Sequence, residues 1–203
     1  DTVCTLLAHA YQHPTTRIGI VHSLGTNCAY YDRTQNITKI RMHNTATADS
    51  EMIVNTEWGN FGSSKRTLPC TWFDRKLDRE SFNPQYHVFE KMTTGIFLAM
   101  LNTPHGFDTS YMYVCEVDQS AELNDTRIIL EDMLNLSKTT LADREIVKKV
   151  CELVGTRAAM LLGAAIAAVV QHMVMNGVDF TQNDEGCAIC KIHFLFIYYF
   201  TLS

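Results

Sequence analysis

Residues 54–62, VNTEWGNFG, join a short β pattern to a loop that contains two glycines. The β pattern begins at Met52 and ends at Thr56, and its apolar and β-branched residues are typical of a strand. Glu57 is the first residue of the loop. A carboxylate in a glycine-bearing loop at the end of a strand is found in ligand sites and in structural turns alike. The stretch therefore predicts one strand and one candidate binding residue.

Helical and strand patterns alternate on both sides of this stretch. The expected elements are a helix over 2–11, a hairpin of strands 17–22 and 28–32 around a turn at 23–27, a polar and turn-rich segment over 63–86, and a helix over 88–101. No internal repeat and no long Gly, Ser or Pro linker interrupts them. The sequence thus predicts an α/β fold that forms one domain, or most of one.

A long helix after Thr140, over about residues 140–175, is the clearest element. Thr140 is a suitable N-cap, and Asp143 lies in the first turn, where the helix dipole favours negative charge. From Ala158 onward every face of the helix is apolar. We therefore expect this half of the helix to be buried on all sides.

Composition excludes several classes of protein. The chain has 203 residues, 46% of them apolar, which suits a globular core rather than a disordered chain. A formal net charge of −5 disfavours a protein that mainly binds nucleic acid. The seven cysteines are odd in number and scattered, as in reduced cytosolic proteins. The most apolar stretch, 158–170, is shorter than the ~20 residues of a membrane helix, so we expect a soluble protein without a transmembrane segment.

Three carboxylates and one amide are candidates for chemistry. Asp1 stands at the head of a helix, Glu57 follows a strand, and Glu90 begins an apolar helix. Helix N-caps and first turns favour such residues for structural reasons, and Asn27 in its turn has the same alternative. A single CxxC at 187–190 and histidines without a paired-ligand pattern do not favour a metal site.

Several blocks of sequence, taken in order, resemble the eukaryotic hexokinase and glucokinase family. The blocks are DTVCT at 1–5, SLGTNCAYY at 23–31, VNTEWGNFG at 54–62, the segment from Phe73 to Met92 with FEKM at its end, and the helix at 140–173 with TRAA at 156–159. The first resembles the family's NDTVGT, and the second resembles its GTGxNxAY phosphate turn. The resemblance covers roughly residues 1–175.

This resemblance implies a ribonuclease-H-like (actin-like ATPase) fold and an ATP-dependent hexose kinase that makes glucose 6-phosphate at the entry to glycolysis, in the cytoplasm. By position, Asp1 is expected to be the general base, while Asn27, Glu57 and Glu90 bind the sugar hydroxyls. The turn glycine Gly25 is expected to approach a phosphate, and Thr109 falls where the family contacts the nucleotide. The cofactor implied is ATP with its bound Mg²⁺, and no metal ligand is assigned to the protein.

Departures from the family pattern lead to further expectations. Ser23 and Leu24 replace a glycine and a threonine of the phosphate turn, which predicts weaker nucleotide binding. Residues 1–175 are expected to form part of the catalytic large domain, and residues 176–203 an aberrant or non-homologous tail. Both ends look cut, so we expect the 203-residue chain alone to be inactive. The alternatives are a non-catalytic sugar-binding or regulatory relative that has lost nucleotide handling and, less favoured by the 54–62 motif, an ATPase for another substrate.

Overall fold

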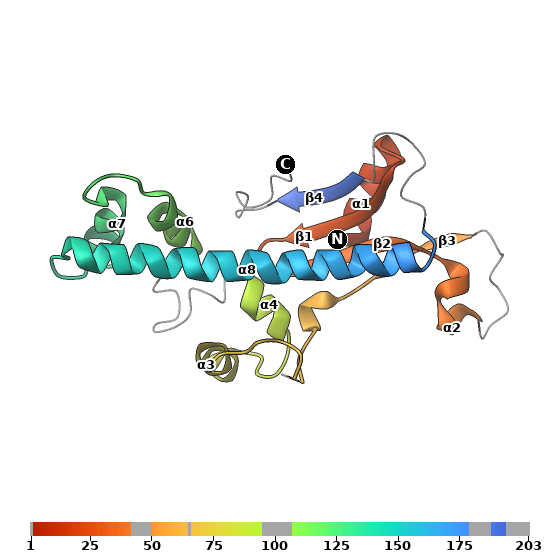
Figure 1. Cartoon of the computed structure of the whole chain (residues 1–203), viewed down its shortest axis with the longest axis horizontal. Helices are drawn as coiled ribbons and strands as arrows, with labels where there is room; N and C mark the ends of the chain where they lie inside the picture. Colours follow the sequence, from red (N-terminus) through yellow and green to blue (C-terminus); the bar gives the residue numbers. More distant parts are fainter. Residues whose placement is uncertain (1, 42–49, 65, 95–106, 179–187, 194–203) are drawn as a thin grey trace. The chain divides into compact units, whose positions relative to one another are not determined.

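In the computed structural model, a four-stranded mixed sheet combines three strands from the N-terminal part of the chain with one strand near the C-terminus (Figure 1). The structure describes residues 2–41, 50–64, 66–94, 107–178 and 188–193. The strand order is β3-β2-β1-β4, in which β1 and β2, and β2 and β3, are antiparallel and β4 runs parallel to β1. The strands are β1 (Thr16–His22), β2 (Thr26–Arg33), β3 (Glu51–Asn55) and β4 (Ala188–His193). The three predicted strands are confirmed.

The chain divides into two compact units. The first contains Asp1–Gly59 and Gly163–Phe194, and the second contains Asn60–Leu162 and Leu195–Ser203. Besides the sheet, the first unit holds helix α1 (Thr2–Gln12), a 3₁₀ turn (Thr34–Asn36) and helix α2 (Thr38–Arg41). The predicted boundary between residues 175 and 176 is not tested by this division and stays a prediction.

Helix α1 packs against β1 at a point where only a glycine leaves enough room. Leu6 is fully buried, and a Cβ added to Gly19 would lie 2.7 Å from the Leu6 Cβ and 3.1 Å from its Cα. Atoms of this kind cannot approach so closely without moving the backbone, because protein interiors are close-packed. The absence of a side chain at Gly19 therefore sets the separation of α1 from the sheet.

The second unit is built from short helices. They are α3 (Trp72–Glu80), α4 (Val88–Thr93), α6 (Thr109–Val117), α7 (Asn124–Ile128) and a π-helical turn (Ile129–Met133). Helix α3 lies where the sequence predicted only turns, so that prediction is wrong. A capping box starts this helix: Thr71 N–H donates to Asp74 Oδ2 at 2.6 Å, and Asp74 N–H donates to Thr71 Oγ1 at 3.4 Å. Of the helix expected over 88–101, α4 confirms the start, and residues 95–101 lie outside the described residues.

Helix α8 (Leu141–Met175) is the predicted long helix. Its predicted cap is confirmed, because Asp143 N–H donates to Thr140 Oγ1 at 3.2 Å. The predicted burial is wrong: of residues 158–175, all described, only Leu162 and Met173 are buried. A helix that is apolar on every face usually packs against other residues on all sides. The pattern does not show that those residues belong to the 203 residues of this chain.

By length and composition alone, α8 qualifies as a helix able to cross a membrane. The mean hydropathy of its most apolar window is 2.0, and 6% of that window is buried. It is the single helix among the described residues that passes this test. Core helices of soluble proteins pass it too, so one such helix is weak evidence for a span. The expectation that the chain lacks a transmembrane segment is therefore not confirmed.

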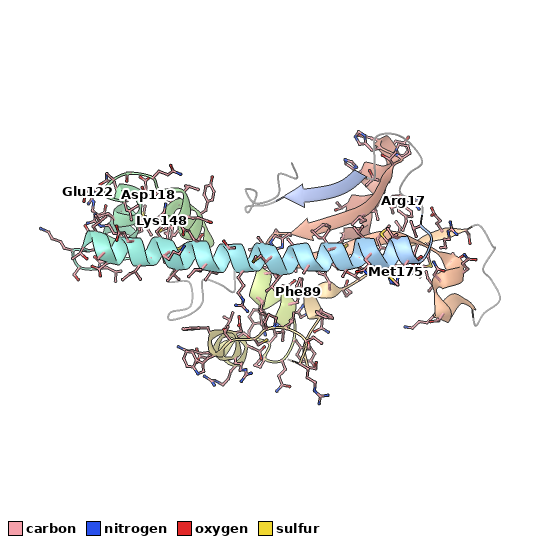
Figure 2. All side chains as sticks on the ribbon, in the orientation of Figure 1. Arg17, Phe89, Asp118, Glu122, Lys148 and Met175 are labelled. Atoms are coloured by element: carbon pink, nitrogen blue, oxygen red, sulfur yellow. The ribbon has the colours of Figure 1, made fainter. Side chains whose placement is uncertain are left out.

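The start of α8 is tied to the loop that follows α6 (Figure 2). Lys148 Nζ donates to the carbonyl oxygens of Glu116, at 3.0 Å, and Asp118. The buried Asp118 carboxylate accepts hydrogen bonds from the backbone and hydroxyl groups of Ser120 and Thr126. Desolvation acts to raise the pKa of Asp118, but these hydrogen bonds outweigh it and lower the pKa to about 2. The ionised carboxylate thus holds the loop in place.

Replacement of Gly19 by alanine tests the packing of α1. We expect Gly19→Ala to lower the free energy of unfolding by about 1–3 kcal/mol, because the new methyl group overlaps Leu6. Gly155→Ala is the matched control: its Cβ would lie 3.5 Å from Glu116 Oε2, an ordinary contact, within a helix that favours alanine. Urea unfolding measures both, and a Gly19→Ala variant as stable as the control would contradict this packing.

Candidate functional site

Asn27, Asn55 and Glu57 form one hydrogen-bonded cluster at the edge of the sheet. Asn27 Nδ2 donates to Asn55 Oδ1 at 2.9 Å and to Glu57 Oε1 at 3.1 Å. Asn55 Nδ2 donates to the same Glu57 oxygen at 2.6 Å. The residues come from the start of β2, the end of β3 and the loop that follows β3. The sheet therefore brings together two of the predicted sugar-binding residues, Asn27 and Glu57.

Residues Thr56 and Trp58 hold the loop beside this cluster. Thr56 donates both its N–H and its hydroxyl to the Cys28 carbonyl oxygen, at 2.9 and 2.8 Å. The buried Trp58 donates its indole N–H to Thr26 Oγ1 at 3.0 Å. These bonds extend the pairing of β2 with β3 past the last residue of β3. The loop is consequently fixed on both sides of Glu57.

Glu57 itself has a left-handed backbone, with a φ of 51°. Residues other than glycine that adopt this region cost the fold about 1–3 kcal/mol, and they are concentrated at functional sites. The position holds a glutamate, although a glycine would adopt the same backbone conformation without strain. The carboxylate is exposed, so burial of the side chain does not explain its presence. This observation favours a ligand-binding role for Glu57 over a structural one.

The cluster has the chemistry of a site for a neutral, hydroxyl-rich ligand. A carboxylate offers about four acceptor positions, and each asparagine side chain both donates and accepts. The two bonds that Glu57 accepts from the amides orient its carboxylate. Hydroxyl groups of a sugar act as donors and acceptors at once, so such a mixed set of groups can bind several of them.

Glu90 lies in the second unit, in the first turn of α4. Its side chain is half-buried, and its Oε1 lies 3.5 Å from His87 Nδ1. The next residue, Lys91, is 2% exposed and donates to Asp78 Oδ1 at 2.8 Å and to the Asn83 carbonyl oxygen at 2.7 Å. This buried ion pair anchors the helix that carries Glu90, because burying a lysine without its partner would be costly.

Of the other predicted site residues, the structure describes Gly25 and Thr109 and does not describe Asp1. Gly25 ends the three-residue turn between β1 and β2, where its carbonyl oxygen accepts the Ser23 N–H at 2.8 Å. Thr109 is the first residue of α6, which Asp108 caps by accepting the Ser110 N–H at 2.8 Å. Hydrogen bonds from Ser110 lower the pKa of Asp108.

Asn55 is a member of the cluster that sequence reasoning did not single out. It stands inside the 54–62 motif, two residues before Glu57. The strand pattern alone gives no reason to assign it a role, because its contact with Asn27 depends on the pairing of β2 with β3. Among the described residues, no group of three or more His, Cys, Asp or Glu side chains could hold a metal ion.

Comparison with known proteins identifies the family. The sequence model of the family described as Hexokinase matches residues 17–101 and 99–191. The chain belongs to the hexokinase family. It is 34% identical to Hexokinase-1 of Saccharomyces cerevisiae over 196 residues, which are 84% of this chain and 40% of that protein. It is equally identical to Hexokinase-1 of Nicotiana tabacum, with 85% of this chain and 39% of that protein covered. The chain thus spans about 40% of the length of these hexokinases.

Solved hexokinase structures confirm the predicted α/β, ribonuclease-H-like fold. A hexokinase from Schistosoma mansoni complexed with glucose superposes with a TM-score of 0.76 and 30% identity, covering 86% of this chain and 44% of that one. A second hexokinase structure has a TM-score of 0.68 at 23% identity and supports the fold alone. The predicted membership of the hexokinase family is confirmed.

Two substitutions at Glu57 separate strain from side-chain chemistry. In urea unfolding, we expect Glu57→Gly to be at least as stable as the parent chain. The variant loses two exposed hydrogen bonds, but it also removes the strain of a left-handed backbone at a non-glycine residue. Glu57→Gln keeps the strain and the side-chain length and should change stability by less than about 0.5 kcal/mol. A Glu57→Gly variant destabilised by more than about 1 kcal/mol would show that Glu57 is structural.

Proposed function

We propose that this chain is the sugar-binding part of an ATP-dependent hexose kinase that phosphorylates glucose on its 6-hydroxyl. The observation that carries the proposal is the cluster of Asn27, Asn55 and Glu57, in which two amides share one carboxylate oxygen. Membership of the hexokinase family agrees with it. The activity would place the protein at the entry to glycolysis, in the cytoplasm.

Each proposed residue has a distinct task. Asn27 and Glu57, with Asn55 beside them, bind ring hydroxyls, and Glu90 is proposed to bind a further hydroxyl. The Asp1 carboxylate takes the proton of the 6-hydroxyl, so that the sugar oxygen becomes a better nucleophile. ATP with its Mg²⁺ supplies the phosphoryl group, and transfer to a hydroxyl depends mainly on in-line positioning and charge neutralisation. Holding the sugar in one orientation is therefore the main contribution of these side chains.

The described residues include only some of the proposed contacts to the nucleotide. The turn at 23–25 offers backbone groups beside Gly25, and Thr109 at the start of α6 is the second proposed contact. At the tip of the turn, Leu24 is 71% exposed and presents an apolar side chain where the resemblance leads one to expect a hydroxyl. At the position of Leu24 the turn thus offers a phosphate its backbone and no side-chain hydroxyl.

Leu24 also supports the second candidate function. A non-catalytic sugar-binding relative would keep the cluster around Glu57 and would not need a phosphate-binding hydroxyl. An exposed leucine changes the stability of the fold little. Its effect is therefore expected on nucleotide binding and not on folding. The two functions share the sugar site and differ in the response to ATP.

A glucose titration followed by tryptophan fluorescence tests the sugar site. Trp58 lies directly after Glu57, and Trp72→Phe removes the other tryptophan of the chain. In that background we expect a saturable response to glucose that Glu57→Gln weakens about 10- to 100-fold, because hydrogen bonds to a charged group are lost. Glu80→Gln, an exposed glutamate on α3, is the matched control and should bind as the parent does. An unchanged affinity in Glu57→Gln would refute the assignment.

A coupled assay for glucose 6-phosphate then distinguishes the candidate functions. With Mg-ATP and glucose, we expect the 203-residue chain to give no turnover. In a longer chain that spans the full length of the relatives, turnover supports the kinase. Saturable glucose binding without turnover in that longer chain supports the sugar-binding relative. Measurable turnover by the 203 residues alone would refute the proposal that they are inactive.

A further inference from the structure

The C-terminal end of α1 brings two imidazole rings together. His13 is four residues after His9, and its N–H donates to the His9 carbonyl oxygen at 2.9 Å, so the helical hydrogen bonding continues one residue past Gln12. Residues four apart lie on the same face of a helix. The two ring centroids are 4.5 Å apart, and the ring planes are tilted by 31°. The rings therefore face one another.

A hydrogen bond to the sheet orients one of these rings. His9 Nδ1 lies 2.8 Å from the hydroxyl oxygen of Thr16, the first residue of β1, and Thr16 is 1% exposed. When His9 Nδ1–H donates to this hydroxyl, Nε2 carries the lone pair. Histidines that bind metal ions through one ring nitrogen usually donate the other to a fixed acceptor. Thr16 thus accepts the hydrogen bond that a metal-binding histidine usually donates from its second ring nitrogen.

The surroundings favour a cation at this place. The last turn of a helix carries partial negative charge from its carbonyl groups, and this charge attracts cations. Two nitrogens bound to one tetrahedral zinc ion at 2.0–2.1 Å lie roughly 3.4 Å apart. Rings with centroids 4.5 Å apart can reach that separation by rotation of the side chains. His13 is exposed and has room for this rotation.

We propose that His9 and His13 form a two-histidine site for a divalent transition-metal ion of the zinc class. Imidazole nitrogens suit Zn²⁺, Cu²⁺ and Ni²⁺, whereas Mg²⁺ and Ca²⁺ prefer oxygen ligands. The site is therefore separate from the Mg²⁺ that accompanies ATP. Because no third His, Cys, Asp or Glu joins the pair among the described residues, water completes the coordination. The bound ion would link the two histidine rings at the end of α1, where His9 is already hydrogen-bonded to Thr16 of β1.

Calorimetric titration of the reduced, untagged 203-residue chain with Zn²⁺ tests the site. We expect one binding event that His13→Ala weakens at least tenfold. The decisive variant exchanges two residues, Tyr11→His with His13→Tyr: it keeps the composition, but histidines two positions apart do not share a helix face. This variant should lose the same event. Thr16→Val should weaken it about 10- to 100-fold through loss of the hydrogen bond to His9.

Other zinc-binding groups of the chain are unchanged in the variants at positions 11, 13 and 16, so they contribute equally to those titrations. His172→Ala, a half-exposed histidine on α8, is the matched control and should bind as the parent does. Circular dichroism confirms that each variant is folded before titration. If the exchanged variant binds Zn²⁺ as tightly as the parent, or if the parent has no event that His13→Ala removes, the proposal is wrong.

Discussion

The pairing of β2 with β3 positions the side chains of the proposed sugar site in this hexokinase-family chain. Ala29 lies opposite Asn55, and the ladder continues through the bond from Thr56 N–H to the Cys28 carbonyl oxygen. Because side chains alternate between the two faces of a strand, a shift of one residue would turn Asn55 away from Asn27. The bonds of Thr56 and Trp58 oppose such a shift. The site is thus a consequence of strand register, and the strained backbone of Glu57 is tolerated because the register holds the loop on both sides.

A second constraint acts on β1, where Gly19 lies opposite Ala29 of β2. The contact of Leu6 with Gly19 brings α1 close to the sheet, and Asp1 directly precedes α1 in the sequence. The same helix carries His9 and His13 at its other end, where His9 meets Thr16 of β1. The helix that follows the proposed general base in the sequence therefore also carries the proposed metal site. A change in the separation of α1 from β1 would disturb the contact between His9 and Thr16.

Local signals in the sequence predicted much of this architecture. The strands, the cap of α8 at Thr140 and the candidate role of Glu57 follow from patterns a few residues long. Helix α3 was missed because its sequence is polar, although Thr71 and Asp74 have the spacing of a capping box. Asn55 was missed because its role depends on the pairing of β3 with a strand distant in the sequence. The pair of His9 and His13 was missed because a spacing of four residues does not by itself give the geometry of the two rings. The exposure of α8 could not be predicted, because an apolar face does not identify what covers it.

The most direct test of the central claim is a nitrogen-15 NMR titration with glucose. The side-chain amide signals of Asn27 and Asn55 and the indole signal of Trp58 report on the cluster from three sides. The account predicts that all three shift together and saturably with glucose and remain in place with sorbitol, an open-chain hexitol. Saturable glucose shifts that map elsewhere and leave these three signals unmoved would contradict it.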